Sequence, residues 1–303
     1  MTNWVPQNEE LFGKHNLKLQ HNLHLSPLFS DDNLARLLEK VEREDYHVNL
    51  MDNGVRREGE IGDASGNEVL EAVRRGDIWV NLRAPVKADS AYGDLLEDIY
   101  AEFESKVPSL STYKRELTIL ISSPNVRVKY HFDVPGQTLW QVRGRKKVFV
   151  YPNSAPFLPQ TWLEKVILNE AHETDLTFQD WFDDHAVTYD LEPGEMLHWP
   201  HNCPHRVDNY DCLNVSVTTE HWTNKLRNSY AVNYANGVLR KTGINNLSRP
   251  QNGLGMLSRL GFAGAVKASG IRNKQIKPYH VDFAVDPQGD RGVRNITPYQ
   301  FQH

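Results

Sequence analysis

Short runs of apolar and β-branched residues, separated by Pro, Gly and Asn turns, fill the middle of the chain. They lie at 117–121, 126–132, 138–142, 147–151, 186–189, 195–199 and 213–219. Short strands punctuated in this way are typical of a β-sandwich or barrel. The pattern predicts a mainly β core over residues 110–222, interrupted at 156–185 by a polar, aromatic stretch that we expect to form helical turns and loops.

The segment before this core mixes helical and strand patterns. Apolar residues recur at helical spacing over about 31–44, 67–75 and 94–103. Ser30 is a suitable N-cap for the first of these helices, and a short strand is predicted at 78–82. Residues 1–30 show no regular pattern and are expected to be an irregular arm. Residues 1–109 are therefore predicted to be an N-terminal α/β segment that packs on the core.

The segment after the core is predicted to be helical. One apolar stripe runs from Leu226 to Leu239, and a Gly-interrupted helical pattern follows over 252–269. A short strand is predicted at 281–285. We expect residues 223–303 to form a helical region that flanks the β core and either covers the substrate or makes a homodimer interface.

Composition narrows the class of protein. The 303 residues are 39% hydrophobic and 24% charged, with a formal net charge of -5, which is ordinary for a folded, soluble protein. A pI of about 6.2 argues against general nucleic-acid binding. No apolar run approaches the roughly 18 residues of a membrane span, and the first residues lack a signal-peptide pattern. Because Cys203 and Cys212 are the only cysteines, we expect a cytoplasmic protein without a disulfide framework. The lack of a long apolar run adds the expectation that the protein has no membrane partner.

Residues 130–133 carry the strongest chemical signal. They read Tyr-His-Phe-Asp, and because side chains alternate along a strand, His131 and Asp133 point to the same face. One imidazole and one carboxylate are two thirds of the 2-His-1-carboxylate triad of non-haem iron(II) sites. The third ligand would be a histidine on a distant strand. The segment 191–205 offers the candidates His198, His201 and His205.

Both stretches resemble the JmjC/cupin family of iron(II)- and 2-oxoglutarate-dependent oxygenases. The pattern Pro-Gly-acidic, apolar strand, Pro, four residues, His at 193–205 resembles the second half of the family motif, in which the ligand is the fifth residue after the strand-ending proline. Counted from Pro200, that residue is His205. The resemblance implies a double-stranded β-helix (cupin or jelly-roll) core in which His131, Asp133 and His205 bind the catalytic iron.

The first stretch resembles most closely the asparaginyl-hydroxylase-like members, of the kind that act on hypoxia-inducible factor. The matching positions are His131, Asp133, Gln141, Gly144, Lys146 and Pro152. In those enzymes a lysine 15 residues after the first histidine pairs with the distal carboxylate of 2-oxoglutarate, and here residue 146 is lysine. The residues agree with this role, because Lys146 shares a strand face with Val148 and Val150 and a buried cation needs a partner.

A different branch of these oxygenases uses an arginine about ten residues after the distal histidine. This chain has no arginine between Arg206 and Arg227, which favours the lysine type. Three positions depart from the asparaginyl-hydroxylase pattern. Val128 replaces a cosubstrate-binding threonine and is most simply a core valine, and Glu220 replaces an asparagine near the last core strand. Gln137 falls where those enzymes have an asparagine lining the site, and we expect it to contact the cosubstrate.

The resemblance implies an oxygenase that uses Fe(II), O2 and 2-oxoglutarate to hydroxylate a side chain of a protein, peptide or amino-acid-like substrate. Decarboxylation of 2-oxoglutarate to succinate would accompany the hydroxylation. The same ligands would also serve a non-catalytic cupin-type protein that binds a metal or small ligand for regulation. Lys146 separates the two hypotheses, because a sensor for an unrelated ligand has no need of it. A demethylase-like role is less favoured, since no chromatin-reader module is recognisable.

Overall fold

The computed structural model describes residues 1–52, 55–245, 247–270 and 279–301. The strands are β1 (Leu17–Gln20), β2 (Tyr46–Asp52), β3 (Val55–Glu60), β4 (Ile78–Leu82), β5 (Tyr113–Ser122), β6 (Arg127–His131), β7 (Gly136–Arg143), β8 (Lys146–Val150), β9 (Val187–Leu191), β10 (Glu195–His198), β11 (His205–Asn209), β12 (Asn214–Trp222), β13 (Tyr279–Val285) and β14 (Val293–Phe301). The α-helices are α1 (Gln7–Leu11), α2 (Asp31–Lys40), α3 (Gly66–Arg75), α4 (Pro85–Ala88), α5 (Ala91–Lys106), α6 (Gln160–Ile167), α7 (Asn224–Lys241) and α8 (Gly253–Ala268).

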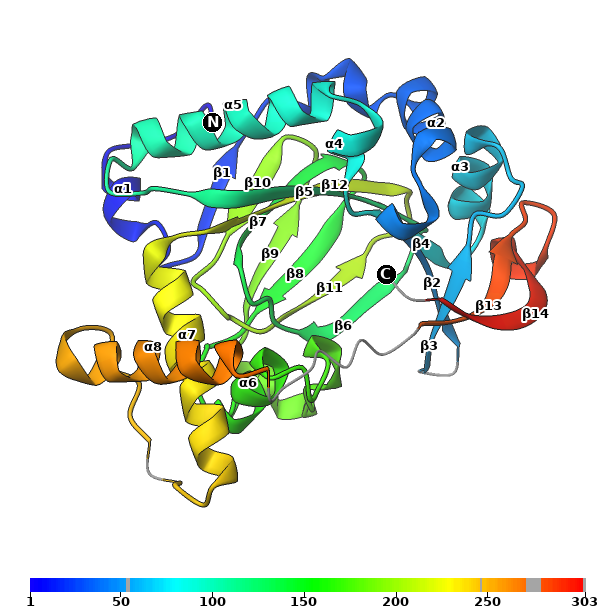
Figure 1. Ribbon diagram of the computed structural model, residues 1–303. Helices are drawn as coiled ribbons and strands as arrows, with labels where there is room; N and C mark the ends of the chain where they lie inside the picture. The colour runs from blue at the N-terminus through cyan, green and yellow to red at the C-terminus, as the bar shows by residue number, and fades with distance from the viewer. Residues whose placement is uncertain (53–54, 246, 271–278, 302–303) are drawn as a thin grey trace.

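Two sheets face each other at the centre of the molecule (Figure 1). The larger has the strand order β1-β10-β7-β12-β5-β4-β2-β3-β13-β14, and the smaller has the order β6-β11-β8-β9. Neighbouring strands run antiparallel, apart from β13 and β3, which run parallel. The apolar interior is made by Leu139, Val148, Val150, Leu191, Leu197, Trp199, Cys203 and Val207. This is the mainly β, cupin-type architecture that the sequence predicts.

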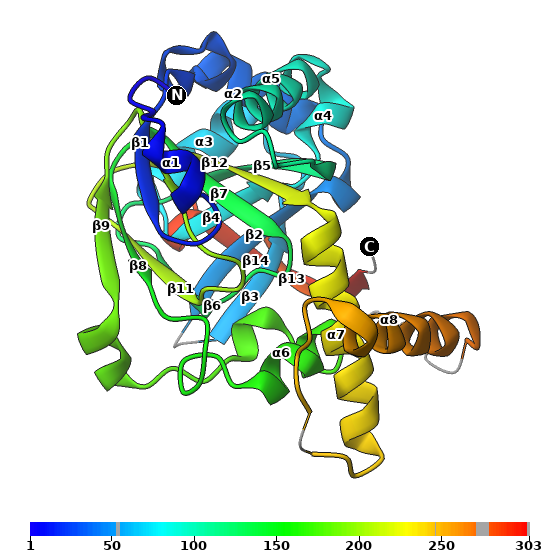
Figure 2. The ribbon, with the colours of Figure 1, turned by 90° about the vertical axis from the view of Figure 1, so that its left-hand side faces the viewer.

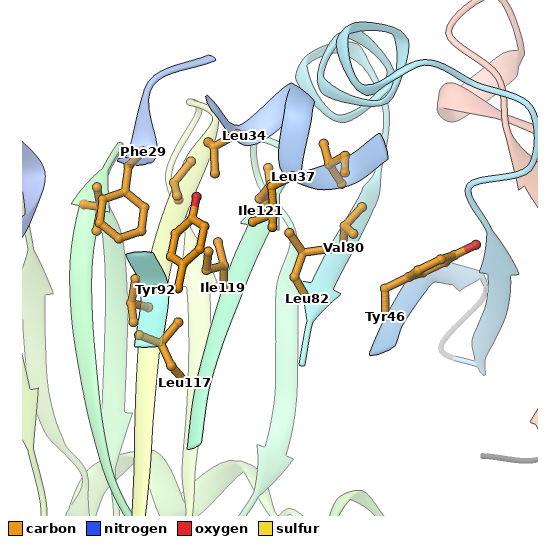
Figure 3. Close-up of a cluster of buried hydrophobic side chains, with 14 of the residues drawn as sticks. Phe29, Leu34, Leu37, Tyr46, Val80, Leu82, Tyr92, Leu117, Ile119 and Ile121 are labelled. Carbon is orange, nitrogen blue, oxygen red and sulfur yellow. The ribbon is translucent and has the colours of Figure 1, made fainter. Parts of the chain in front are cut away.

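A second apolar core anchors helices to the outer face of the larger sheet. Figure 3 shows Leu34 and Leu37 of α2 and Tyr92 of α5 beside the outward-facing side chains of β5. The β5 residues in this core are Leu117, Ile119 and Ile121. Their alternation leaves the intervening residues of β5 facing the interior between the two sheets. The same strand thus serves the outer core with one face and, through Leu120, the interior between the sheets with the other.

The helices predicted before the β core are confirmed. Within α2, Ser30 is the N-cap, and its Oγ accepts a hydrogen bond from the Asn33 backbone N–H at 3.4 Å. This helix ends at Lys40 rather than near residue 44, because Val41 has an extended backbone conformation. The strand predicted at 78–82 is β4, and the two helices predicted after the core are α7 and α8.

The expected irregular arm at 1–30 is wrong in part, because residues 17–20 form β1 and pair with β10. The strands β2, β3, β11 and β14 were not predicted. Few apolar residues mark three of them: β3 reads Val-Arg-Arg-Glu-Gly-Glu, β11 reads His-Arg-Val-Asp-Asn, and β14 is half-buried or exposed along its length. Hydrophobic periodicity misses strands whose buried positions are polar.

The larger sheet extends beyond residues 110–222 at both edges, with β1 at one edge and β4, β2, β3, β13 and β14 toward the other. β4 pairs with β5, so the N-terminal α/β segment and the core share one sheet, and β3 and β13 carry the sheet further. The division of the chain at 109/110 and 222/223 stays a prediction. In the described part of the chain, no helix has both the length and the apolar character required to cross a membrane.

Candidate metal centre

His131, Asp133 and His205 come together at one end of the two-sheet core. His131 is the last residue of β6 and His205 the first of β11, and the two are partners in the register of these strands. Their ring centroids are 4.2 Å apart. One ligand atom from each of His131, Asp133 and His205 lies within 4.8 Å of the other two. The fold therefore brings His205 beside His131 and Asp133, which precede it by about 70 residues.

Hydrogen bonds to the backbone fix the orientation of both imidazole rings. The Nδ1 of His131 donates to the Lys129 carbonyl at 2.7 Å, and the Nδ1 of His205 donates to the Cys203 carbonyl at 3.2 Å. A carbonyl only accepts, so each Nδ1 carries the ring proton and each Nε2 has a free lone pair. Metal-binding histidines are commonly held by such a bond from the second nitrogen. Burial lowers the pKa of both histidines, which keeps the lone pairs available.

The Asp133 carboxylate is enclosed without a hydrogen-bond donor. Its Oδ2 lies 3.4 Å from His205 Nε2, but that nitrogen carries no proton, and no donor in the described part of the chain reaches Oδ2. Burial raises the pKa of Asp133 to about 7. An anionic oxygen facing two nitrogen lone pairs is unfavourable unless a cation lies between them.

The loop between β10 and β11 holds the backbone next to Asp133. Asn202 Nδ2 donates to the Asp133 carbonyl and His201 Nε2 donates to the Val134 carbonyl, both at 2.7 Å. His201 therefore supports the site through the backbone. His198 lies on the other face of the sheet, where its Nε2 accepts from the Gly13 N–H at 3.1 Å and its ring stacks on Phe12. Of the three candidate histidines, the structure brings only His205 to His131.

The three residues fit a divalent metal ion. Two neutral imidazole nitrogens and one carboxylate oxygen converge with free lone pairs, and the orphaned Asp133 Oδ2 lacks the positive charge that an ion would supply. Three protein ligands on one side leave coordination positions for other molecules, as in 2-His-1-carboxylate sites. His205 is buried, whereas His131 and Asp133 are half-buried, so the site is reached from the side of these two residues.

Lys146 is buried in the same interior. It is the first residue of β8 and is 4% exposed, on the face that also carries Val148 and Val150. In the β8–β11 register Val150 faces His205, so Lys146 lies four residues, about 13 Å of strand, from His205. Burial lowers the pKa of Lys146 to about 7. Within the described residues, no carboxylate forms an ion pair with its ammonium group.

Gln137 and Val128, the two further positions compared with cosubstrate-binding positions of the family, lie on strands that line the interior. Gln137 is half-buried near the start of β7, on the face that also carries Leu139 of the interior core. It is paired with Glu220 of β12. Val128 of β6 packs against the same core, as expected for a core valine.

Sequence patterns did not identify two glutamates near the triad as site residues. Glu173 lies in a short 3-10 helix (Glu173–Asp175), and Glu220 was singled out only as a departure from the family pattern. Burial, followed by the charge of Asp133, raises the pKa of Glu173 to about 7 and that of Glu220 to about 8. The positive charge of Arg83 counteracts these effects by lowering the pKa of both carboxyl groups. Glu173 belongs to an irregular segment, where neither periodicity nor a motif marks such a residue.

Solved structures with a similar fold include the ribosomal oxygenase YcfD from Escherichia coli. A crystal structure of YcfD has 17% sequence identity and a TM-score of 0.50, covering 89% of this chain and 68% of that one. YcfD in complex with cobalt and 2-oxoglutarate has 16% identity and a TM-score of 0.51, with coverages of 89% and 68%. At such identities the similarity concerns the fold. No curated protein matches the chain.

A family model gives a more direct assignment. Residues 65–226 match the model of the cupin-like domain. The matched region is more than half of the chain, and it contains both motif stretches with His131, Asp133, Lys146 and His205. Together with the fold, this match confirms the resemblance to JmjC/cupin proteins. The chain belongs to the cupin-like domain family.

Proposed function

We propose that this protein is an Fe(II)- and 2-oxoglutarate-dependent dioxygenase that hydroxylates a side chain of a protein, peptide or amino-acid-like substrate. The observation that carries the proposal is the presence of two complementary sites in one interior. The triad converges within 4.8 Å, and the buried ammonium of Lys146 lies four residues away along paired strands. A protein that only binds a metal needs the first site but has no use for the second.

In this proposal His131, Asp133 and His205 hold the iron. Lys146 binds the distal carboxylate of 2-oxoglutarate, and Gln137 contacts the same cosubstrate. When bound, iron(II) supplies the redox chemistry that couples oxidation of 2-oxoglutarate by O2, giving succinate and CO2, to hydroxylation of a substrate C–H bond. The backbone hydrogen bonds of His131 and His205 hold their Nε2 atoms toward the ion.

The separation between the two sites suits this cosubstrate. Lys146 and His205 are separated by about 13 Å of strand, and the lysine side chain spans part of this distance. The distance that remains is comparable with the length of a short dicarboxylic acid. Binding would also remove an energetic cost, because the buried ammonium gains an anionic partner. The solved complex of YcfD with cobalt and 2-oxoglutarate supports the same assignment, since this chain shares its fold.

We also propose that α8 mediates a homodimer. The helix packs on α7, but Leu254 is 84% exposed, Leu257 57% and Phe262 36%, whereas Ala263 is its one buried residue. A helix that exposes several large apolar side chains is unfavourable in water and marks an interaction surface. A second copy of the chain would cover this surface.

Succinate formation from 2-oxoglutarate tests the enzymatic proposal. In aerobic buffer with Fe(II), wild type is expected to form succinate slowly even without its substrate, and His205→Ala is expected to lose this activity. Lys146→Ala should raise the KM for 2-oxoglutarate, Lys146→Arg should restore part of the loss, and Lys147→Ala serves as the matched control. Iron binding without succinate formation at any 2-oxoglutarate concentration would instead support a non-catalytic, cupin-type binding protein.

A further inference from the structure

Two glutamates of the larger sheet face the interior on the side opposite β6 (Figure 1). Leu117 of β5 and Val217 of β12 belong to the outer core of this sheet. Because strand side chains alternate, Glu116 and Glu220 face the other way, toward the space between the two sheets. The two glutamates are direct cross-strand partners, and like charges in such a pair are destabilising.

Glu173 brings a third carboxyl group to the same space. The short 3-10 helix that carries it packs against β6, the strand that ends at His131. Burial raises the pKa of Glu220, and nearby negative charges raise it further. These charges belong to Asp133, Glu116 and Glu173. The three glutamates therefore lie close to one another and to the metal ligands, and we call them the glutamate cluster.

The glutamate cluster lacks a counter-charge in the described part of the chain. No carboxyl group of the cluster forms a hydrogen bond or an ion pair with another described residue. Arg83 acts on two of them only through its charge, because its Nη1 donates to His47 Nε2 at 3.3 Å. Elsewhere the buried glutamates Glu58 and Glu164 each have an arginine partner, at 3.3 and 2.6 Å. Enclosed carboxylates without such a partner are unfavourable, and a cationic ligand would supply one.

The interior is marked as a ligand-binding site independently of the glutamate cluster. Lys146 is 4% exposed and forms no ion pair with a described carboxylate, and Asp133 Oδ2 is buried without a donor. Lys146 accounts for an anionic cosubstrate. The charges of Asp133 and His131 act on Glu173, and these two ligands are on the side from which the metal centre is reached. The glutamate cluster is thus placed to contact the substrate.

We propose that the substrate presents a cationic side chain, whose charged group is bound by Glu173 and Glu220 while a neighbouring carbon is hydroxylated. This inference rests on the proposed oxygenase function and names the substrate class of that site. An ammonium or guanidinium group has N–H donors and no acceptor, which suits a cluster of acceptors. One oxygen atom of O2 enters the substrate C–H bond and the other enters succinate as 2-oxoglutarate loses CO2, so the cationic group is unchanged.

Peptide mixtures with one fixed central residue test this inference, because the flanking positions are randomised. Arginine is compared with its neutral isostere citrulline, and lysine with norleucine. Affinities are measured by fluorescence polarisation on the full-length protein with Fe(II) and 2-oxoglutarate under anaerobic conditions, so that no turnover is required. At least one cationic mixture should bind roughly tenfold more tightly than its neutral counterpart, as expected for charge-assisted hydrogen bonds. Added salt should reduce this preference.

Substitutions that change one charge at a time locate the binding groups. Glu220→Gln and Glu173→Gln should each reduce the preference for the cationic mixture roughly fivefold, whereas Arg83→Gln should increase it by removing a like charge. Glu97→Gln is the matched control and should bind as wild type does, because Glu97 is exposed on α5 and pairs with Arg115. Equal binding of cationic and neutral mixtures, or an unchanged preference in both cluster variants, would overturn the inference.

Succinate formation in air separates this inference from the proposed function. Wild type should form succinate faster with the cationic mixture, and mass spectrometry should find one added oxygen atom on the central residue. Absence of succinate with and without peptide would refute the oxygenase function itself. Succinate formation combined with equal binding of cationic and neutral mixtures would overturn only the substrate class.

Discussion

Lys146 is a buried cation with no carboxylate partner in the described part of the chain. Its pKa is lowered to about 7 by burial. A structural lysine in such a position would be costly, and an apolar residue would serve the packing with Val148 and Val150 better. The cost is explained if the residue is retained to bind an anionic cosubstrate.

Replacing Lys146 by methionine should therefore stabilise the ligand-free protein. The unfolded lysine titrates near pH 10.4 and the folded one near 7. Below pH 7 both states carry the proton and the full burial cost applies, whereas between pH 7 and 10 the folded state releases it and wild type regains stability. Lys146→Met should exceed wild type by roughly 5 kcal/mol in unfolding free energy at pH 6, and by roughly 2 kcal/mol at pH 9.

Denaturant unfolding at pH 6 and pH 9 measures this difference. Lys147→Met is the matched control, because Lys147 is the next residue of β8 and lies half-buried on its other face. It should show no comparable change with pH. A gap between Lys146→Met and wild type that is the same at both pH values would show that the ammonium is not buried as described.

Residues whose roles follow from strand periodicity could be predicted from the sequence. The convergence of His131 and Asp133 was predicted from strand alternation, although β6 ends at His131 and Asp133 lies just beyond the strand. Lys146 shares a strand face with Val148 and Val150 as predicted. The choice among His198, His201 and His205 needed the family resemblance, since spacing alone left it open. Glu173 could not be found, because its position near Asp133 depends on how an irregular segment folds back on β6.

At the scale of elements, the turn between β7 and β8 places Lys146. Gly144 has φ +71°, and a Cβ there would lie 2.2 Å from the Leu213 carbonyl oxygen. Both the left-handed backbone and the close approach exclude a side chain. This is a physical reason for the glycine in the motif, which the sequence showed only as a matching position.

Gly144→Ala should lower the unfolding free energy by roughly 3 kcal/mol, as expected for backbone strain combined with a steric clash. It should also weaken 2-oxoglutarate binding, because the displaced turn carries Lys146. Gly243→Ala is the matched control: Gly243 has φ +92° but no atom within 4 Å of an added Cβ, so about 1 kcal/mol of backbone strain is expected. Equal losses in the two variants would contradict the tight approach to Leu213.

Element prediction succeeded where apolar residues alternate and failed where polar residues take the buried positions. The strands β5, β7, β8 and β12 carry clear apolar patterns and were predicted. β11 was not, because its buried positions include His205 and Asn209. The strand that supplies a metal ligand is thus harder to recognise from hydrophobicity than the strands that form the core.

At the scale of the whole molecule, α7 and α8 project from one end of the two-sheet core (Figures 1 and 2). Only Ala263 of α8 is fully buried, and Leu254, Leu257 and Phe262 are exposed. Such a projecting helix pair gains stability chiefly by packing against another surface. If α8 forms an interface between two copies, the molar mass of the protein in solution should be that of a dimer.

Light scattering after size exclusion is expected to show a dimer at micromolar concentration. The double substitution Leu254→Lys and Leu257→Lys should give monomers, because charges would replace the apolar contact. Val187→Lys is the control, since Val187 is 50% exposed on β9 and lies outside α8. A wild-type protein that is monomeric at all accessible concentrations would contradict the proposed interface.

The most direct test of the oxygenase account is an anaerobic titration of Fe(II) and 2-oxoglutarate followed in the visible range. A 2-oxo acid chelated to iron(II) gives a weak charge-transfer band, so wild type should develop this band with saturation. His131→Ala should abolish it, and Lys146→Ala should require far more 2-oxoglutarate to reach it. If iron binds but no band appears at any practical 2-oxoglutarate concentration, the metal centre stands and the assignment of 2-oxoglutarate as cosubstrate is wrong.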